Sequence, residues 1–136
     1  MDPTLQMILA LLMRWTHILS VIVLVGSAYY VRRTRSGFAP EFRSTVYTAA
    51  ALAFGSGLYN FLTKGSYPAG YHMWFGIKFL LALHVLAALV LAAKRGGAGE
   101  KLERSLRITL FSATAAILIS GYLRWLTQHA GAVKLP

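Results

Sequence analysis

The chain has 136 residues, of which 57% are hydrophobic and 13% charged, with a formal net charge of +10. With a mean hydropathy of +0.56, this composition excludes a soluble domain and is typical of an integral membrane protein. The absence of cysteine excludes disulfides, thiolate ligands and thiol nucleophiles.

Four apolar stretches fill most of the chain: residues 5–31, 45–62, 73–93 and 106–126. A helix needs about 20 residues to cross a hydrocarbon core about 30 Å thick, so each stretch is predicted to be a transmembrane helix. Short connections predict a single all-α domain over residues 1–136: a polytopic membrane protein built as an antiparallel four-transmembrane-helix bundle. The first stretch is too long for a signal-peptide core and lacks a basic start and a cleavage site, so we expect it to stay in the mature protein.

Small residues recur at four-residue spacing on two of these predicted helices. The second stretch carries Ala49, Ala53 and Gly57, and the fourth carries Ser112, Ala116 and Ser120. Such ridges let helix backbones approach closely, so they predict tight packing within the bundle.

Charged residues mark the connections between the apolar stretches. Basic side chains follow the first and the third stretch: Arg32, Arg33, Arg35, Arg43, Lys94, Arg95, Lys101 and Arg104. The positive-inside rule makes both connections cytoplasmic and predicts both termini on the outer side of a bacterial inner membrane. An aromatic belt at the outer boundary agrees, with Trp15, Tyr67, Tyr71, Trp74, Tyr122 and Trp125. Topology and anionic lipid headgroups thus explain the basic clusters, and nucleic-acid binding is not expected.

Ionisable residues inside the apolar stretches are the strongest functional signal, because a charge in hydrocarbon is costly. Counted at 1.5 Å per residue from the basic connections, His17 lies about 22 Å up, Lys78 about 24 Å and Arg14 about 27 Å. Arg124 lies near the outer edge of the fourth stretch. These four groups are predicted to share one layer in the outer half of the membrane. Snorkelling to the surface is the alternative for Arg14, Lys78 and Arg124.

The chain offers this layer no carboxylate. All four acidic residues, Asp2, Glu41, Glu100 and Glu103, lie at the N-terminus or in segments predicted to be cytoplasmic. An anion from outside the chain is therefore the expected partner, and haem or porphyrin propionates, a lipid phosphate or a quinone oxygen would each serve. Tyr59, Asn60 and Tyr122 are candidates for further hydrogen bonds, and Arg14, Tyr59 and Asn60 are candidates for facing a quinone.

Two histidines are candidate metal ligands. His17 has a short side chain and does not reach water from its depth, so we expect a ligand or proton-transfer role, with an interhelical hydrogen bond as the alternative. His84 lies about 15 Å up and is the candidate second axial ligand of a haem, provided that helix tilt removes a depth difference of about 7 Å. Soft thioethers suit Cu(I), and four methionines lie on the predicted outer side, but no tight Met or His cluster supports copper: Met1, Met7, Met13 and Met73.

Three short motifs resemble the four-helix membrane superfamily of the copper-resistance D-like proteins and the HemJ-type protoporphyrinogen oxidases. They are Trp15-Thr16-His17-Ile18-Leu19 followed by Gly26, the stretch from Arg43 to Gly57-Leu58, and Trp74-Phe75-Gly76-Ile77-Lys78-Phe79-Leu80. The resemblance implies that His17 binds a b-type haem and that Lys78 serves activity. The chain lacks the arginine expected near Lys78, where Trp74 stands one turn earlier, and the aromatic-proline-arginine run expected after the first helix.

These patterns leave four functions open. The first is a haem b-binding protein that functions in redox chemistry or electron transfer, in which His17, Lys78, Arg14 and Arg124 contact the anionic cofactor. A HemJ-like oxidoreductase acting on protoporphyrinogen comes second, a cofactor-free subunit of a larger membrane complex third, and copper transport last. The expected partners are the lipid bilayer, a quinone or redox partner protein, and further copies or subunits. No nucleophile triad, phosphate loop or carboxylate pair indicates a hydrolase or an NTPase.

Overall fold

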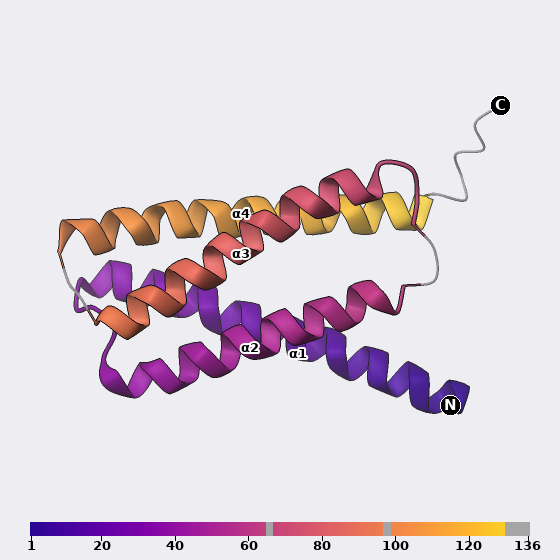
Figure 1. The fold of residues 1–136 in the computed structure, drawn as a ribbon, viewed down its shortest axis with the longest axis horizontal. Helices are drawn as coiled ribbons and strands as arrows, with labels where there is room; N and C mark the ends of the chain where they lie inside the picture. Colours follow the sequence, from indigo (N-terminus) through magenta and orange to yellow (C-terminus); the bar gives the residue numbers. More distant parts are fainter. Residues whose placement is uncertain (65–66, 97–98, 130–136) are drawn as a thin grey trace.

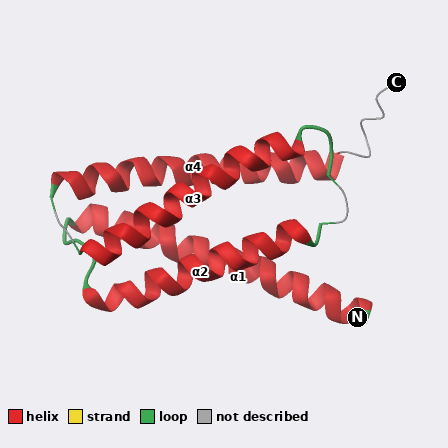
Figure 2. Cartoon of the chain, in the orientation of Figure 1, coloured by secondary structure: helices red, strands yellow, loops and turns green. Residues whose placement is uncertain are grey.

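The computed structural model describes residues 1–64, 67–96 and 99–129, and in this part of the chain every regular element is a helix. The helices are α1 (Pro3–Thr34), α2 (Pro40–Leu62), α3 (Tyr71–Arg95) and α4 (Glu100–His129). Successive helices run in opposite directions (Figure 1), and short connections join them (Figure 2). The predicted all-α class is confirmed.

Local residue chemistry sets the helix ends, which lie a few residues beyond the apolar stretches. The side chain of Asp2 accepts a hydrogen bond from the Thr4 amide at 3.0 Å and caps α1. Proline stands at the start of α1 and α2, where its missing N–H is not needed. Gly96 ends α3 in the left-handed conformation, at a φ of 58°. These residues set the ends of α1 and α3 and the start of α2, so at these ends the helices extend past the apolar stretches into the polar flanks.

Three of the helices, α1, α3 and α4, are long and apolar enough to cross a membrane. Helix α2 has 23 residues and the length to cross, but Thr, Ser, Gly, Asn and Tyr dilute its apolar side chains. Many large apolar side chains face outward, among them Phe111 at 81% exposure and Leu118 at 70%. Such a surface needs lipid to cover it, so the structure supports membrane association.

The two ends of the helix assembly differ in chemistry. We call the end formed by the α1–α2 and α3–α4 connections the basic end, because Arg32, Arg33, Lys94 and Arg95 stand in the last turns that lead to it. We call the opposite end the aromatic end, where ring pairs join Tyr67, Tyr71, Phe75, Trp74, Tyr122 and Trp125.

Helix α1 packs mainly on α2 and α3 mainly on α4, and smaller interfaces join α1 to α4 and α2 to α3.

The hydrophobic core is concentrated in the half near the basic end. Its members on α1, α2, α3 and α4 include Leu24, Ala28, Val46, Leu89, Ala92, Ala93 and Leu106, and the polar Thr109 is buried beside them. In the other half, the buried residues of the described chain are Ala53, Ser56, Tyr71 and Leu123. The N-terminal part of α1 diverges from α3 and α4 (Figure 1), with exposed Leu5, Leu12 and Trp15. Buried side chains are therefore concentrated near the basic end, and toward the aromatic end the N-terminal part of α1 separates from α3 and α4.

The core near the basic end predicts a strong dependence on side-chain size at Ala93. Ala93 is 0% exposed, so Ala93→Leu overpacks the helix contact and should destabilise the fold by about 1–3 kcal/mol. Ala87 lies on the same helix and is exposed, so Ala87→Leu is the matched control and should change stability little. Thermal unfolding in detergent measures both variants, and equal stability of the two would contradict this account of the core.

Candidate anion and cofactor site

His17 is held in one orientation by the backbone of α2. Its Nδ1 lies 2.9 Å from the carbonyl oxygen of Ala53 and 3.3 Å from Oγ of Ser56. The Ser56 hydroxyl donates to the carbonyl of Leu52. Because a carbonyl only accepts, Nδ1 carries the hydrogen, and in the neutral imidazole the lone pair is on Nε2. The interhelical hydrogen bond expected as one alternative for His17 is therefore present.

Gly57 provides the surface against which the imidazole lies. A Cβ atom at this position would stand 3.0 Å from Cε1 and 3.2 Å from Nδ1 of His17. These distances are tighter than nine in ten Cβ contacts, so the ring would have to shift by a few tenths of an ångström to admit a larger residue. The small-residue ridge of the second apolar stretch thus does more than bring the helices together. Ala53 supplies the carbonyl and Gly57 supplies the space that position His17.

Three further cations follow one another from His17 toward the aromatic end, on α3, after α2 and on α1. The positive charge of Lys78, on α3, acts on His17, that of Lys64 acts on Lys78, and that of Arg14 acts on Lys64. Lys78 is half-buried, with its Nζ 6.0 Å from the centroid of the Phe75 ring. We call Arg14, His17, Lys64 and Lys78 the cationic layer. The structure brings together three residues that the sequence placed at one depth, and adds Lys64.

Lys64 follows α2 and joins the ends of three helices. Its Nζ donates to Oγ1 of Thr127 at 2.9 Å and to the hydroxyl of Tyr71 at 3.4 Å, and lies 4.4 Å from the centroid of the Tyr71 ring. Burial lowers the pKa of the Lys64 ammonium, and the positive charge of Arg14 lowers it further. Sequence reasoning missed Lys64 because it follows an apolar stretch and reads as a loop residue. The sequence does offer one indication that Lys64 is unusual, since it is the one fixed charge between the second and third apolar stretches.

In the described part of the chain, no aspartate or glutamate forms an ion pair with the cationic layer. Asp2 caps α1, Glu41 stands in the first turn of α2, and Glu100 and Glu103 stand in the first turn of α4. Within the described residues, the ion pair of the chain joins Glu103 to Arg107 at 3.7 Å, near the basic end. The positive charges of the layer therefore favour an anion that residues 1–64, 67–96 and 99–129 do not supply.

The structure does not bring His84 to His17. His84 is exposed and lines a cleft between α3 and α4 with Lys101, Arg104, Ser105 and Ile108. His17 instead contacts α2 in the other half of the bundle. A haem held between these two histidines does not fit this arrangement.

The other sequence candidates take separate positions near the aromatic end. Arg124 is exposed. Tyr122 packs on Trp74, with ring centroids 5.4 Å apart, and on Trp125, at 6.0 Å, so its ring belongs to the aromatic end. Tyr59 and Asn60 are half-buried near the end of α2, and within the described chain neither side chain forms a hydrogen bond.

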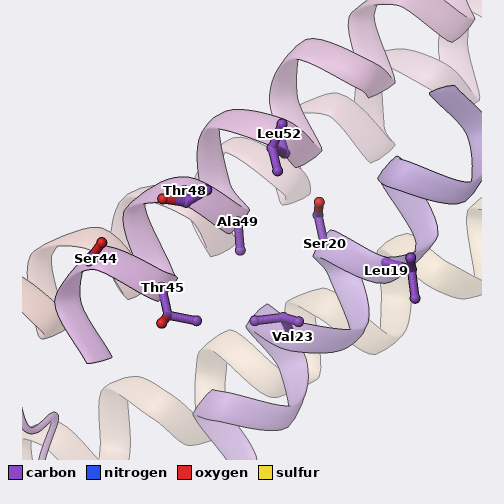
Figure 3. A pocket seen from close by; sticks show the side chains of 8 residues that line it. All are labelled: Leu19, Ser20, Val23, Ser44, Thr45, Thr48, Ala49 and Leu52. Atoms are coloured by element: carbon purple, nitrogen blue, oxygen red, sulfur yellow. The ribbon is translucent and has the colours of Figure 1, made fainter. Parts of the chain in front are cut away.

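A cleft lies between α1 and α2 (Figure 3) and is lined from α1 by Leu19, Ser20 and Val23, which follow His17 along the helix. Val23 and Thr45 point toward one another across it (Figure 3), and Ser20 and Ala49 line it one turn further along. The Ser20 hydroxyl is satisfied within its own helix, since it donates to the carbonyl of Thr16 at 2.7 Å. The cleft contains no member of the cationic layer and no charged residue.

No group of three or more His, Asp or Glu side chains able to hold a metal occurs within residues 1–64, 67–96 and 99–129. A haem iron needs only one or two protein ligands, so this finding does not bear on haem. Comparison of the chain with protein-family models, with curated proteins and with solved structures gives no match.

The position of Lys64 predicts a response to a distant substitution. Arg14→Gln removes the neighbouring positive charge, so the pKa of Lys64 should rise toward its ordinary value of 10.5. Arg124→Gln makes the same chemical change on an exposed residue of α4 and should leave that pKa unchanged. A titration of isotope-labelled lysines by NMR in detergent measures both.

The lowered pKa of Lys64 also gives the sign of a pH effect. Between this lowered pKa and 10.5, the unfolded chain binds more protons than the folded chain, so the contribution of Lys64 to stability rises with pH. Arg14→Gln should reduce this rise. An equal pH dependence in both proteins would contradict the electrostatic contact between Arg14 and Lys64.

Proposed function

We propose that this chain is a membrane-embedded protein that binds haem b and functions in redox chemistry or electron transfer. His17 would be the axial ligand, and the cationic layer would neutralise the haem propionates. The observation that carries the proposal is the hydrogen bond from Nδ1 of His17 to the carbonyl of Ala53. Metal-ligating histidines almost always donate their second ring nitrogen in this way, which sets the tautomer and directs Nε2 to the metal.

The donor set of the layer fits a haem in charge as well as in ligation. Lys78 is the charged neighbour of His17, Lys64 that of Lys78, and Arg14 that of Lys64, and each cation can pair with a propionate carboxylate. When bound, haem supplies one-electron chemistry, and the protein sets its ligation, burial and local charge. Lys64 and Lys78 would hold the propionates and orient the ring plane relative to His17. His84 is not part of this proposal.

The proposed topology has four spans, with α2 as the least apolar. Helix α2 runs antiparallel to α1 (Figure 1) and buries its small face, Ala49, Ala50 and Ala53, inside the bundle. A helix packed in this way needs fewer large apolar side chains to cross. With the basic end on the cytoplasmic side, both termini and the cationic layer would lie on the outer side of a bacterial inner membrane.

Porphyrinogen oxidation is the second candidate. The observation in its favour is that Lys78 acts electrostatically on His17, since these are the two positions to which the HemJ resemblance assigns activity and haem binding. A quinone that accepts the electrons would face the exposed Arg14, with Tyr59 and Asn60 nearby. Electron transfer ranks first because Trp74, one turn before Lys78, packs on Tyr122, and no arginine stands at that position.

A haem ligated by His17 should be visible in the absorption spectrum of the purified protein. The full chain, isolated in detergent from haem-replete cells, should show a Soret band that shifts on reduction with dithionite. His17→Ala should lose this band, and His84→Ala should retain it unchanged. A colourless wild-type protein would overturn the haem proposal and favour a cofactor-free packing subunit.

Two glycines of α2 test whether the orientation of His17 matters. Gly57→Ala should lower haem content, because the added methyl lies 3.0 Å from Cε1 of the imidazole and the ring must shift to admit it. Disturbing the groups that orient a metal ligand typically costs about 10–100-fold in metal affinity. Gly55 has no neighbour within 4 Å of an added Cβ, so Gly55→Ala is the matched control and should keep the haem.

The role of Lys78 is tested by its charge. Lys78→Met keeps the apolar stem and removes the ammonium, so the reduced haem should lose stabilisation and the midpoint potential should fall by about 50 mV, equivalent to about 1 kcal/mol for one electron. Lys94→Met alters a lysine of the same helix at the basic end and should leave the potential unchanged. A potential and haem content equal to wild type in Lys78→Met would remove Lys78 from the site.

A further inference from the structure

The cleft between α3 and α4 at the basic end has chemistry that the proposed haem site does not use. Its lining on α4 is Lys101, Arg104, Ser105 and Ile108, and His84 lines it from α3. The spacing of the four α4 residues, at i, i+3, i+4 and i+7, places them on one face of the helix. One face of α4 therefore forms most of the cleft lining, and the imidazole of His84 on α3 completes it.

The two cations of this cleft have no carboxylate partner within the described residues. Glu103 pairs with Arg107 instead, at 3.7 Å, and Glu100 forms no ion pair in that part of the chain. The carbonyl of Ser105 accepts a hydrogen bond from Thr109, but its hydroxyl makes none with the described chain. The cleft therefore presents two positive charges and one available hydroxyl.

Along the cleft, the lining changes from charged side chains near the start of α4 to apolar side chains further along the helix. Lys101 and Arg104 stand in the first two turns of α4, and Ile108 follows, 49% exposed. The same face continues to Phe111, at 81% exposure. Cations at the boundary followed by exposed apolar side chains match an amphiphile with an anionic headgroup and an acyl chain. A free phosphate would leave the apolar part of this face without a partner.

We propose that this cleft binds an anionic glycerophospholipid from the leaflet at the basic end. Lys101 and Arg104 would hold the phosphate, the Ser105 hydroxyl would donate to a headgroup oxygen, and an acyl chain would lie along Ile108 and Phe111. The site lies at the opposite end of the bundle from the cationic layer. It does not depend on the haem proposal, and either can fail without the other.

Lipid titration of the full chain in detergent, followed by native mass spectrometry, tests the proposal. The probes are phosphatidylglycerol and phosphatidylcholine with the same acyl chains. Phosphatidylglycerol should bind more tightly, and Lys101→Gln with Arg104→Gln should weaken its binding about 25-fold, from about fivefold for each cation that contacts an anionic lipid. Lys101→Arg with Arg104→Lys keeps both charges and should keep the binding, which separates lost charge from a folding defect.

A second pair of arginines provides the matched control. Arg32→Gln with Arg33→Gln removes the same charge from α1 at the same end and should leave phosphatidylglycerol binding within twofold of wild type. Equal weakening by both double variants would overturn the proposal, because it would mean a diffuse surface effect. So would equal affinity for the two lipids, or displacement of phosphatidylglycerol by the same concentration of inorganic phosphate.

Discussion

Close contact between small side chains at the basic end is the constraint on which the rest of this structure depends. Lipid tails are as apolar as leucine, so helices in a membrane gain little from burying large apolar groups and associate mainly through van der Waals contact. Ala49 on α2, Ala93 on α3 and Ala113 on α4 are buried and let the backbones approach. Leu24 and Leu89, at 2% and 1% exposure, fill the space between them.

Because this contact is confined to one half, the other half has room for polar groups. His17 stands on the border, where the small ridge of α2 still keeps the helices close enough for its ring to reach the carbonyl of Ala53. Beyond it, Lys78 and Lys64 lie among aromatic rings, with Phe75 and Tyr71 beside their ammonium groups. Ring faces attract cations, which reduces the cost of placing them there. The rings supply no net negative charge, so the layer stays positive.

The two ends of the bundle use positive charge differently. At the basic end, cations stand at the boundary and face the leaflet beside exposed apolar side chains such as Ile108. At the other end, Lys64 is tied to Tyr71 and Thr127 within the bundle. A charge tied in this way has lost part of its hydration, so it interacts more strongly with an incoming anion than a fully hydrated charge does. This difference is why we assign a cofactor to one end and a lipid to the other.

Sequence by itself determined the helical class and the approximate positions of the helices, because hydropathy depends only on chain order. A rise of about 1.5 Å per residue also predicts one depth for Arg14, His17, Lys78 and Arg124, and this stays a prediction. Tertiary structure alone decided which residues face one another. The placement of His84 in a different cleft and the joining of three helices by Lys64 both follow from how each helix is rotated about its axis. That rotation is set by contacts such as Gly57 against His17, which join residues far apart in the chain and leave no local pattern in the sequence.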